Sequence, residues 1–206
     1  MVINAAPSTV SIVTPLAHLP LRIRPAVAIS DDALFDLCRI NRDLRIERTP
    51  DGEIVIMTPT GGETGRKNFN LVVAFGTWVA RDATGVGFDS STGFLLPNGA
   101  ERSPDVAWVR RARWEALTEE QRRKFVPLCP DFVIELRSPS DDLADLEGKM
   151  REYASCGCSL GWLIDPDARS VQIWRADASV DVLNDPKSLS GEDVLPGFVL
   201  DLRSVW

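Results

Sequence analysis

Ser103-Pro-Asp-Val-Ala-Trp-Val109 and Asp131-Phe-Val-Ile-Glu-Leu136 are the two stretches of this sequence that decide its fold. Short apolar runs rich in β-branched and aromatic residues are typical of buried strands. Each run also carries a carboxylate, Asp105 in the first and Glu135 in the second. An ionised group in such a setting costs several kcal/mol unless it is paired or coordinates a cation. We therefore expect a compensating cation, a metal or a basic side chain, beside these carboxylates.

The regions on either side of these runs predict an alternation of strands and helices. Pro50-Asp-Gly52 separates two runs as a hairpin turn does, and Gly85 is expected to end a helix with an apolar face. The expected strands are Leu44–Thr49, Glu53–Thr58, Val86–Asp89, Pro104–Val109, Phe132–Leu136, Gly161–Ile164 and Ser170–Trp174, and the expected long helices are Glu63–Asp82 and Asp142–Ala154. This order predicts an α/β fold, in which a mixed central β-sheet is flanked by helices.

The length of 206 residues fits one domain. We expect an N-terminal arm at residues 1–29 and a single domain at residues 30–206, opened by a short helix that Ser30 caps. The sequence contains no apolar run long enough for a membrane span and no basic leader. We accordingly expect a cytoplasmic protein with no membrane partner, in which the four cysteines are reduced thiols.

Histidine chemistry is nearly excluded, because His18 is the only histidine and lies in the expected arm. Lys149 is the stronger candidate for a functional base or cation. It lies at i+3 from Leu146 and at i−4 from Tyr153, so its stem follows the apolar face of the second long helix. There it can reach Glu135, and burial would lower its pKa toward a range useful for handling water. A purely structural Glu135–Lys149 ion pair is the alternative that the residues leave open.

Two basic regions are candidates for nucleic-acid contact in a chain whose net charge is −7. The segment from Arg110 to Lys124, with Arg111 and Arg113, carries six basic and three acidic residues. The other region is Arg66-Lys67, beside Glu63, which opens the first long helix and is a candidate to extend a metal shell. The structural alternatives are a solvated helix with i,i+4 ion pairs for the insertion, and a helix-dipole role for Glu63.

Four separated motifs resemble the Uma family of restriction endonucleases, which belongs to the PD-(D/E)XK superfamily. In chain order they are Pro104-Asp105, Pro130-Asp-Phe-Val-Ile-Glu-Leu-Arg-Ser-Pro-Ser140, Asp145-Leu-Glu-Gly-Lys-Met-Arg-Glu-Tyr153 and Gly161-Trp-Leu-Ile-Asp-Pro166. The resemblance implies a restriction-endonuclease-like core, Mg²⁺ or Mn²⁺ held by Asp105 and Glu135, and phosphodiester cleavage in nucleic acid. By position, Lys149 matches the lysine that this family places on the next helix, and Tyr153 and Arg137 are further candidates.

One position departs from the superfamily pattern, since Arg137 stands where a lysine is usual. An arginine stays protonated and cannot act as a base. Either Lys149 takes over that role, or the site is degenerate and the chain is a nucleic-acid or protein binding module. The first alternative predicts a Mg²⁺-dependent DNA endonuclease, with RNA as a substrate that the sequence leaves open. Cleavage of both strands of a duplex would further favour a homodimer.

Overall fold

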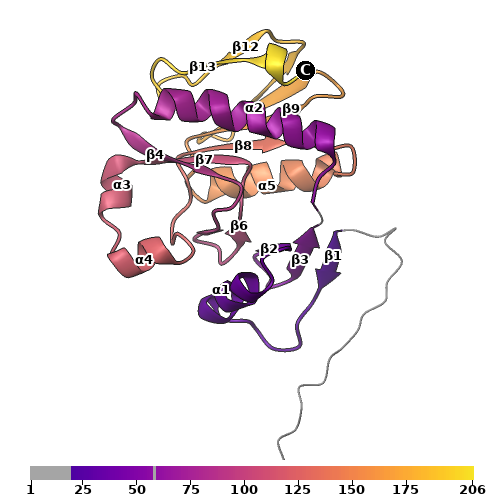
Figure 1. Ribbon diagram of the computed structural model, residues 1–206, viewed down its shortest axis with the longest axis vertical. Coiled ribbons are helices and arrows are strands. Elements are labelled where there is room, and N and C mark those ends of the chain that lie inside the picture. Colours follow the sequence, from indigo (N-terminus) through magenta and orange to yellow (C-terminus); the bar gives the residue numbers. More distant parts are fainter. Residues whose placement is uncertain (1–19, 58) are drawn as a thin grey trace, which may run out of the picture.

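The computed structural model describes residues 20–57 and 59–206, and it forms two main β-sheets with helices packed on both faces of the larger one (Figure 1). Most of the expected arm, residues 1–19 with His18, lies outside the described residues, and so does Thr58.

The central sheet has six strands in the order β11-β10-β9-β8-β7-β4. Their bounds are β4 Gly85–Asp89, β7 Val106–Arg110, β8 Phe132–Leu136, β9 Leu160–Asp165, β10 Ser170–Arg175 and β11 Val180–Asn184. β8 and β9 are parallel, whereas the other neighbours pair antiparallel. The sheet is therefore mixed, as predicted, and the bounds of β8 coincide with the expected strand.

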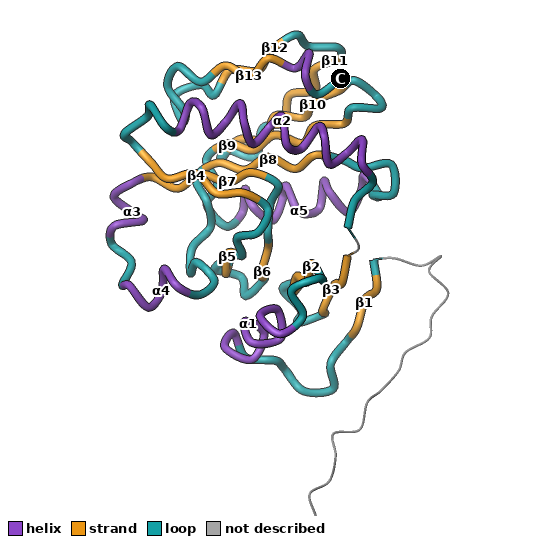
Figure 2. The backbone as a smooth tube through the Cα atoms, in the orientation of Figure 1, coloured by secondary structure: helices purple, strands orange, loops and turns teal. Residues whose placement is uncertain are grey.

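Two long helices cover opposite faces of this sheet: α2, Gly62–Val79, and α5, Leu143–Ser155 (Figures 1 and 2). Phe75 of α2 packs with the alternate side chains Val106 and Trp108 of β7. The side chains on the opposite face of β7, Ala107 and Val109, pack on the α5 side of the sheet. Alternate side chains of β7 thus enter two different apolar cores, one on each face of the sheet, which confirms the expected α/β layering.

The second sheet has the order β1-β3-β2-β6-β5 and lies beyond α5 in Figure 1. Its strands are β1 Leu21–Ile23, β2 Arg45–Arg48, β3 Ile54–Met57, β5 Phe94–Leu95 and β6 Glu101–Arg102. The predicted hairpin is confirmed: β2 and β3 pair antiparallel, and Gly52 turns the chain with φ of 84°. The segment at residues 21–23, expected in the arm, pairs with β3 as an edge strand.

The remaining elements are short. They are α1 Asp31–Ile40, α3 Arg111–Glu115, α4 Glu119–Arg123, β12 Ser188–Ser190, β13 Val199–Asp201 and the 3₁₀ turn Leu202–Ser204. Ser30 caps α1 as predicted, since its hydroxyl accepts a hydrogen bond from the Ala33 N–H.

The expected role of Gly85 as the end of a helix is wrong, because α2 ends at Val79 and Gly85 opens β4. A Cβ atom at Gly85 would lie 2.1 Å from the Trp108 ring, so the side chain of the neighbouring strand explains this glycine. All four cysteines are free thiols, as expected. In the described part of the chain, no helix has both the length and the apolar composition that a bilayer-spanning helix needs.

Candidate active site

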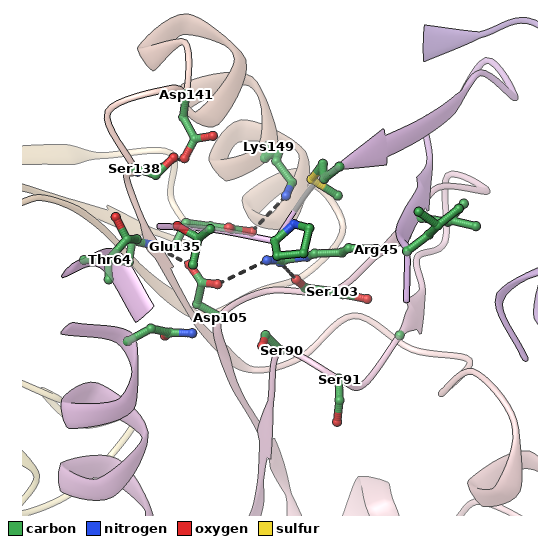
Figure 3. Close-up of a pocket in the computed structure, with 18 of the residues that line it drawn as sticks. Arg45, Thr64, Ser90, Ser91, Ser103, Asp105, Glu135, Ser138, Asp141 and Lys149 are labelled. Atoms are coloured by element: carbon green, nitrogen blue, oxygen red, sulfur yellow. Dashed lines mark hydrogen bonds and ion pairs between the residues drawn. The ribbon is translucent and has the colours of Figure 1, made fainter. Parts of the chain in front are cut away.

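A cavity of about 640 Å³ lies where the hairpin sheet faces the central sheet and the ends of α2 and α5. Asp105, Glu135 and Lys149, the three principal residues expected from the sequence, all line it. Figure 3 shows their side chains gathered at one place, together with Arg45 from β2. Elements far apart in the chain therefore meet at this site.

Asp105 occupies the bend directly before β7, whose first residue is Val106 rather than the expected Pro104. One carboxylate oxygen, Oδ2, accepts a hydrogen bond of 2.8 Å from the backbone N–H of Leu136 in the neighbouring strand. The other, Oδ1, lies 3.4 Å from Nη1 of Arg45. The backbone of β8 thus fixes one edge of the carboxylate, and the second edge faces a cation.

Glu135 is 3% exposed and projects from the middle of β8. The hydroxyl of Tyr153 donates to Oε1 at 2.9 Å, and Nζ of Lys149 lies 3.3 Å from the same oxygen. Burial raises the pKa of this carboxyl, and the charge of Lys149 opposes the shift. Tyr153 and Lys149 lie one turn apart on α5, so this helix face positions and compensates the buried acid.

The ammonium group of Lys149 is held between two carboxylates, since Glu47 Oε1 lies 3.0 Å from Nζ on the other side. Burial alone would lower the pKa of Lys149, but Glu135 and Glu47 outweigh it and the pKa is raised above its usual value. The expectation of a lowered pKa is therefore wrong. It considered burial without the second carboxylate, which β2 contributes.

Glu47 and Arg45 are site residues that the sequence reasoning missed. Glu47 is 2% exposed, and besides Lys149 it pairs with Arg102 at 3.2 Å, which in turn contacts Glu152 at 2.5 Å. The pKa of Glu47 is lowered because Lys149, Arg102 and Arg45 outweigh its burial. A strand that alternates charged residues, as Arg45-Ile-Glu47 does, is the available signal, because both side chains then face one side.

Two of the secondary candidates lie away from this cluster. Arg137 is paired with Asp165 at 2.6 Å, at the ends of the adjacent strands β8 and β9. The carboxylate of Glu63 is exposed and pairs with Arg66 one turn along α2 at 2.6 Å. Neither Arg137 nor Glu63 lines the cavity, and neither do Arg66 and Lys67.

The basic insertion has local partners. Arg110 and Arg113 lie 3.3 and 3.0 Å from Asp131, and Arg111 donates to the backbone carbonyl of Gly85. The predicted i,i+4 pairs are present, Arg123 with Glu119 and Lys124 with Glu120. These contacts support the structural alternative for the insertion, and none of its arginines lines the cavity.

The donor chemistry at Asp105 and Glu135 fits a small divalent cation. Within residues 20–57 and 59–206, no three His, Cys, Asp or Glu side chains are grouped as a preformed cation site. Mg²⁺, however, is usually held by one or two carboxylates, with water and phosphate oxygens completing its shell. Both contacts of Glu135 use Oε1, which leaves Oε2 outside the hydrogen bond and ion pair that hold the side chain.

Comparisons with known proteins identify the family and the fold of this chain. The model of the Uma2 family, described as "Putative restriction endonuclease", matches residues 31–203. A solved structure described as a "putative nuclease belonging to DUF820", from Anabaena variabilis ATCC 29413, superposes with a TM-score of 0.65 at 18% identity. The similarity covers 78% of this chain and 88% of that one, and it shows a common fold. Among curated proteins, none is similar enough to count as a match.

Proposed function

Since this chain belongs to the Uma2 family, we propose that it is a nuclease that hydrolyses phosphodiester bonds of DNA with Mg²⁺ or Mn²⁺. One observation carries the proposal: Asp105, directly before β7, and Glu135 of the neighbouring strand β8 lie with the partly buried Lys149 at the wall of one polar cavity. Catalytic sites are where such costly buried charges are expected.

The side chains divide the work of hydrolysis. Asp105 and Glu135 would hold the cation, which polarises the phosphate and acidifies a water molecule when bound. Tyr153 keeps Glu135 oriented through its hydrogen bond of 2.9 Å. The raised pKa of Lys149 favours the ammonium form, so its proposed role is to stabilise the negative charge that develops on the phosphate.

Nucleic acid must approach an acidic protein, and the cavity provides local features that favour it. Arg45 contributes positive charge to the lining, which also carries the hydroxyl groups of several serines and threonines. These groups are suited to phosphate and sugar oxygens, which take most protein contacts in nucleic-acid complexes. Arg110, Arg111 and Arg113 with Arg66 and Lys67 stay proposed as weaker, peripheral contacts outside the cavity.

A plasmid-nicking assay with Mg²⁺ or Mn²⁺ tests the proposal. Asp105→Asn and Glu135→Gln are expected to lose at least about a hundredfold in rate, since each removes charge at the reacting centre. Asp43→Asn is the matched control, because Asp43 is exposed and lines the same cavity. Equal nicking by the wild type and Asp105→Asn would refute the assignment.

The alternative is a binding module without cleavage, and the same preparation distinguishes it. A wild-type protein that retards DNA in a gel but leaves the plasmid intact with either metal would establish this alternative. An RNA oligonucleotide of the same sequence in parallel tests the choice of DNA.

We propose a homodimer as the active form, because cutting both strands of a duplex requires two sites. Phe69 and Val73 of α2 lie one turn apart and are 67% and 49% exposed, an apolar pair available to a second copy. Light scattering should give a dimer mass for the wild type at micromolar concentration. A monomer mass would remove this part of the proposal.

A further inference from the structure

Arg45 has an incomplete set of contacts for a guanidinium group. Its Nη2 donates to the carbonyl of Ser103, and Nη1 lies at 3.4 Å from Asp105, near the limit of an ion pair. The Nε–H group is buried and has no hydrogen-bond partner among the described residues. Such a buried, unsatisfied donor is uncommon in folded proteins and requires an explanation.

The surroundings of this donor point to a ligand in the cavity. Arg45 lines the cavity and its side chain is 32% exposed. Two further buried polar atoms that lack partners, Asn68 Oδ1 and Glu101 Oε2, belong to residues lining the same cavity. Three of the five buried side-chain atoms without a hydrogen-bond partner among the described residues therefore belong to the lining of this cavity. The Nε–H of Arg45 is the one donor of these three, and it is the group that an anionic ligand would satisfy.

The charge of Arg45 also opposes any cation at Asp105. The guanidinium faces Oδ1, while Oδ2 is occupied by the Leu136 N–H. A divalent ion that binds through Oδ1 must therefore compete with Arg45 for this oxygen. When Arg45 turns away from both Asp105 and the Ser103 carbonyl, the planar fork of Nε and Nη2 can bind a phosphate through two parallel hydrogen bonds.

We propose that Arg45 is a phosphate-binding residue of the cavity that competes with the divalent cation for Asp105 and turns to the nucleic-acid backbone when the cation binds. This inference rests on the proposed nuclease function, which it deepens by naming a substrate contact. It also makes two predictions of opposite sign for one substitution. Loss of the Arg45 charge should strengthen cation binding and weaken nucleic-acid binding.

The first measurement is a calorimetric titration of the full chain with Mn²⁺, without nucleic acid. Arg45→Gln is expected to bind Mn²⁺ about tenfold more tightly than the wild type, because a neighbouring positive charge is removed. Arg42→Gln is the matched control, since Arg42 lines the same cavity but donates only to the Arg39 carbonyl. Its Mn²⁺ affinity should stay within about twofold of the wild type.

The second measurement is the fluorescence anisotropy of a labelled DNA duplex with Ca²⁺, a cation that also takes carboxylate oxygens. Arg45→Gln should bind the duplex about tenfold more weakly, and Arg42→Gln should bind it nearly as the wild type does. A variant that is merely misfolded would lose affinity for both ligands, so the opposite signs identify the proposed role. Arg45→Lys keeps the charge without the fork and should lose only DNA affinity.

The outcomes separate this inference from the proposed function. If the wild type and Arg45→Gln bind Mn²⁺ equally, or Arg42→Gln changes both affinities as much, the inference about Arg45 is wrong and the nuclease proposal stands. If Arg45→Lys binds DNA as the wild type does, the phosphate fork is refuted. If neither protein binds Mn²⁺, the metal proposal fails together with the inference. Mn²⁺ binding by Arg45→Gln alone would support the competition directly.

Discussion

The carboxylate of Glu47 lies closer to the ammonium group of Lys149, at 3.0 Å, than the expected partner Glu135 does, at 3.3 Å. Glu47 precedes Lys149 by 102 positions and belongs to the sheet that contains the β2–β3 hairpin, whereas Lys149 lies on α5. This contact joins the hairpin to the helix that covers the central sheet.

Glu47→Gln should destabilise the fold by about 3 kcal/mol, because it removes a buried carboxylate and leaves Lys149 with Glu135 alone and Arg102 with Glu152 alone as charged partners. Chemical denaturation with urea measures the change in the free energy of unfolding. Glu119→Gln, which breaks the exposed pair with Arg123, serves as the control and should cost less than about 0.5 kcal/mol. Equal losses in the two variants would show that the Glu47 pair adds nothing beyond a surface contact.

Lys149→Gln should lower the rate of cleavage at least about a hundredfold while Mn²⁺ binding persists, because the lysine stabilises charge on the phosphate and holds no metal. The pKa of Lys149 is raised, so the ammonium keeps its proton throughout the neutral and mildly alkaline range. The pH profile of kcat for the wild type should then show no loss attributable to this lysine between pH 7 and pH 10. A basic limb in that interval that disappears in Lys149→Gln would contradict the assigned role.

Arg137→Gln should leave cleavage within about twofold of the wild type, although this position carries the lysine in the superfamily pattern. The structure pairs Arg137 with Asp165, outside the cavity. The side chain is 29% exposed, so the expected loss of stability is about 1 kcal/mol. Plasmid nicking measures the effect on cleavage and urea denaturation measures the effect on stability. A hundredfold loss of nicking would show that Arg137 has a role in the reaction.

The buried carboxyl group of Glu101 should make the free energy of unfolding depend on pH. Burial and the nearby Glu47 raise its pKa to about 8 in the folded protein, whereas the unfolded chain should titrate near the ordinary value of 4.5. Between these values the folded state retains a proton that the unfolded state has lost, so stability falls as pH rises. The loss should be complete above about pH 8 and amount to about 5 kcal/mol.

Glu101→Gln removes this titration, so the variant should gain stability relative to the wild type as pH rises from 5 to 9. Urea denaturation at several pH values gives the difference in unfolding free energy. Glu119→Gln, at an exposed position, should show no such trend. A difference between wild type and Glu101→Gln that stays constant with pH would mean that Glu101 is ionised in the folded state throughout.

The sequence predicted the site residues that stand out within a local pattern of neighbouring residues. The carboxylates of Asp105 and Glu135 stand out because apolar strand residues surround them, and the helical spacing from Leu146 to Tyr153 places Lys149 on the face toward the sheet. These are local patterns, and the fixed period of a strand or a helix determines which face each side chain occupies in the structure.

The other half of the site could not be predicted in the same way. The alternation of Arg45 and Glu47 indicates that both side chains share one face of the hairpin, but no local pattern predicts that this face meets Lys149 of α5. The strands β5 and β6 have only two residues each, too few for any alternation to be recognised. The error about the pKa of Lys149 has the same origin, since it depends on a charge brought from a distant strand.

Because the cavity lies between two sheets, the candidate site can form only when both sheets have folded and packed together. Glu135 belongs to the central sheet and Asp105 lies directly before its strand β7. Arg45 and Glu47 belong to the hairpin sheet. A nascent or clipped chain without a docked hairpin would keep the two acids but lack the partners that restrain Asp105 and Lys149. Completion of the tertiary fold and assembly of the reaction centre are therefore a single event, and activity itself becomes a reporter of native architecture.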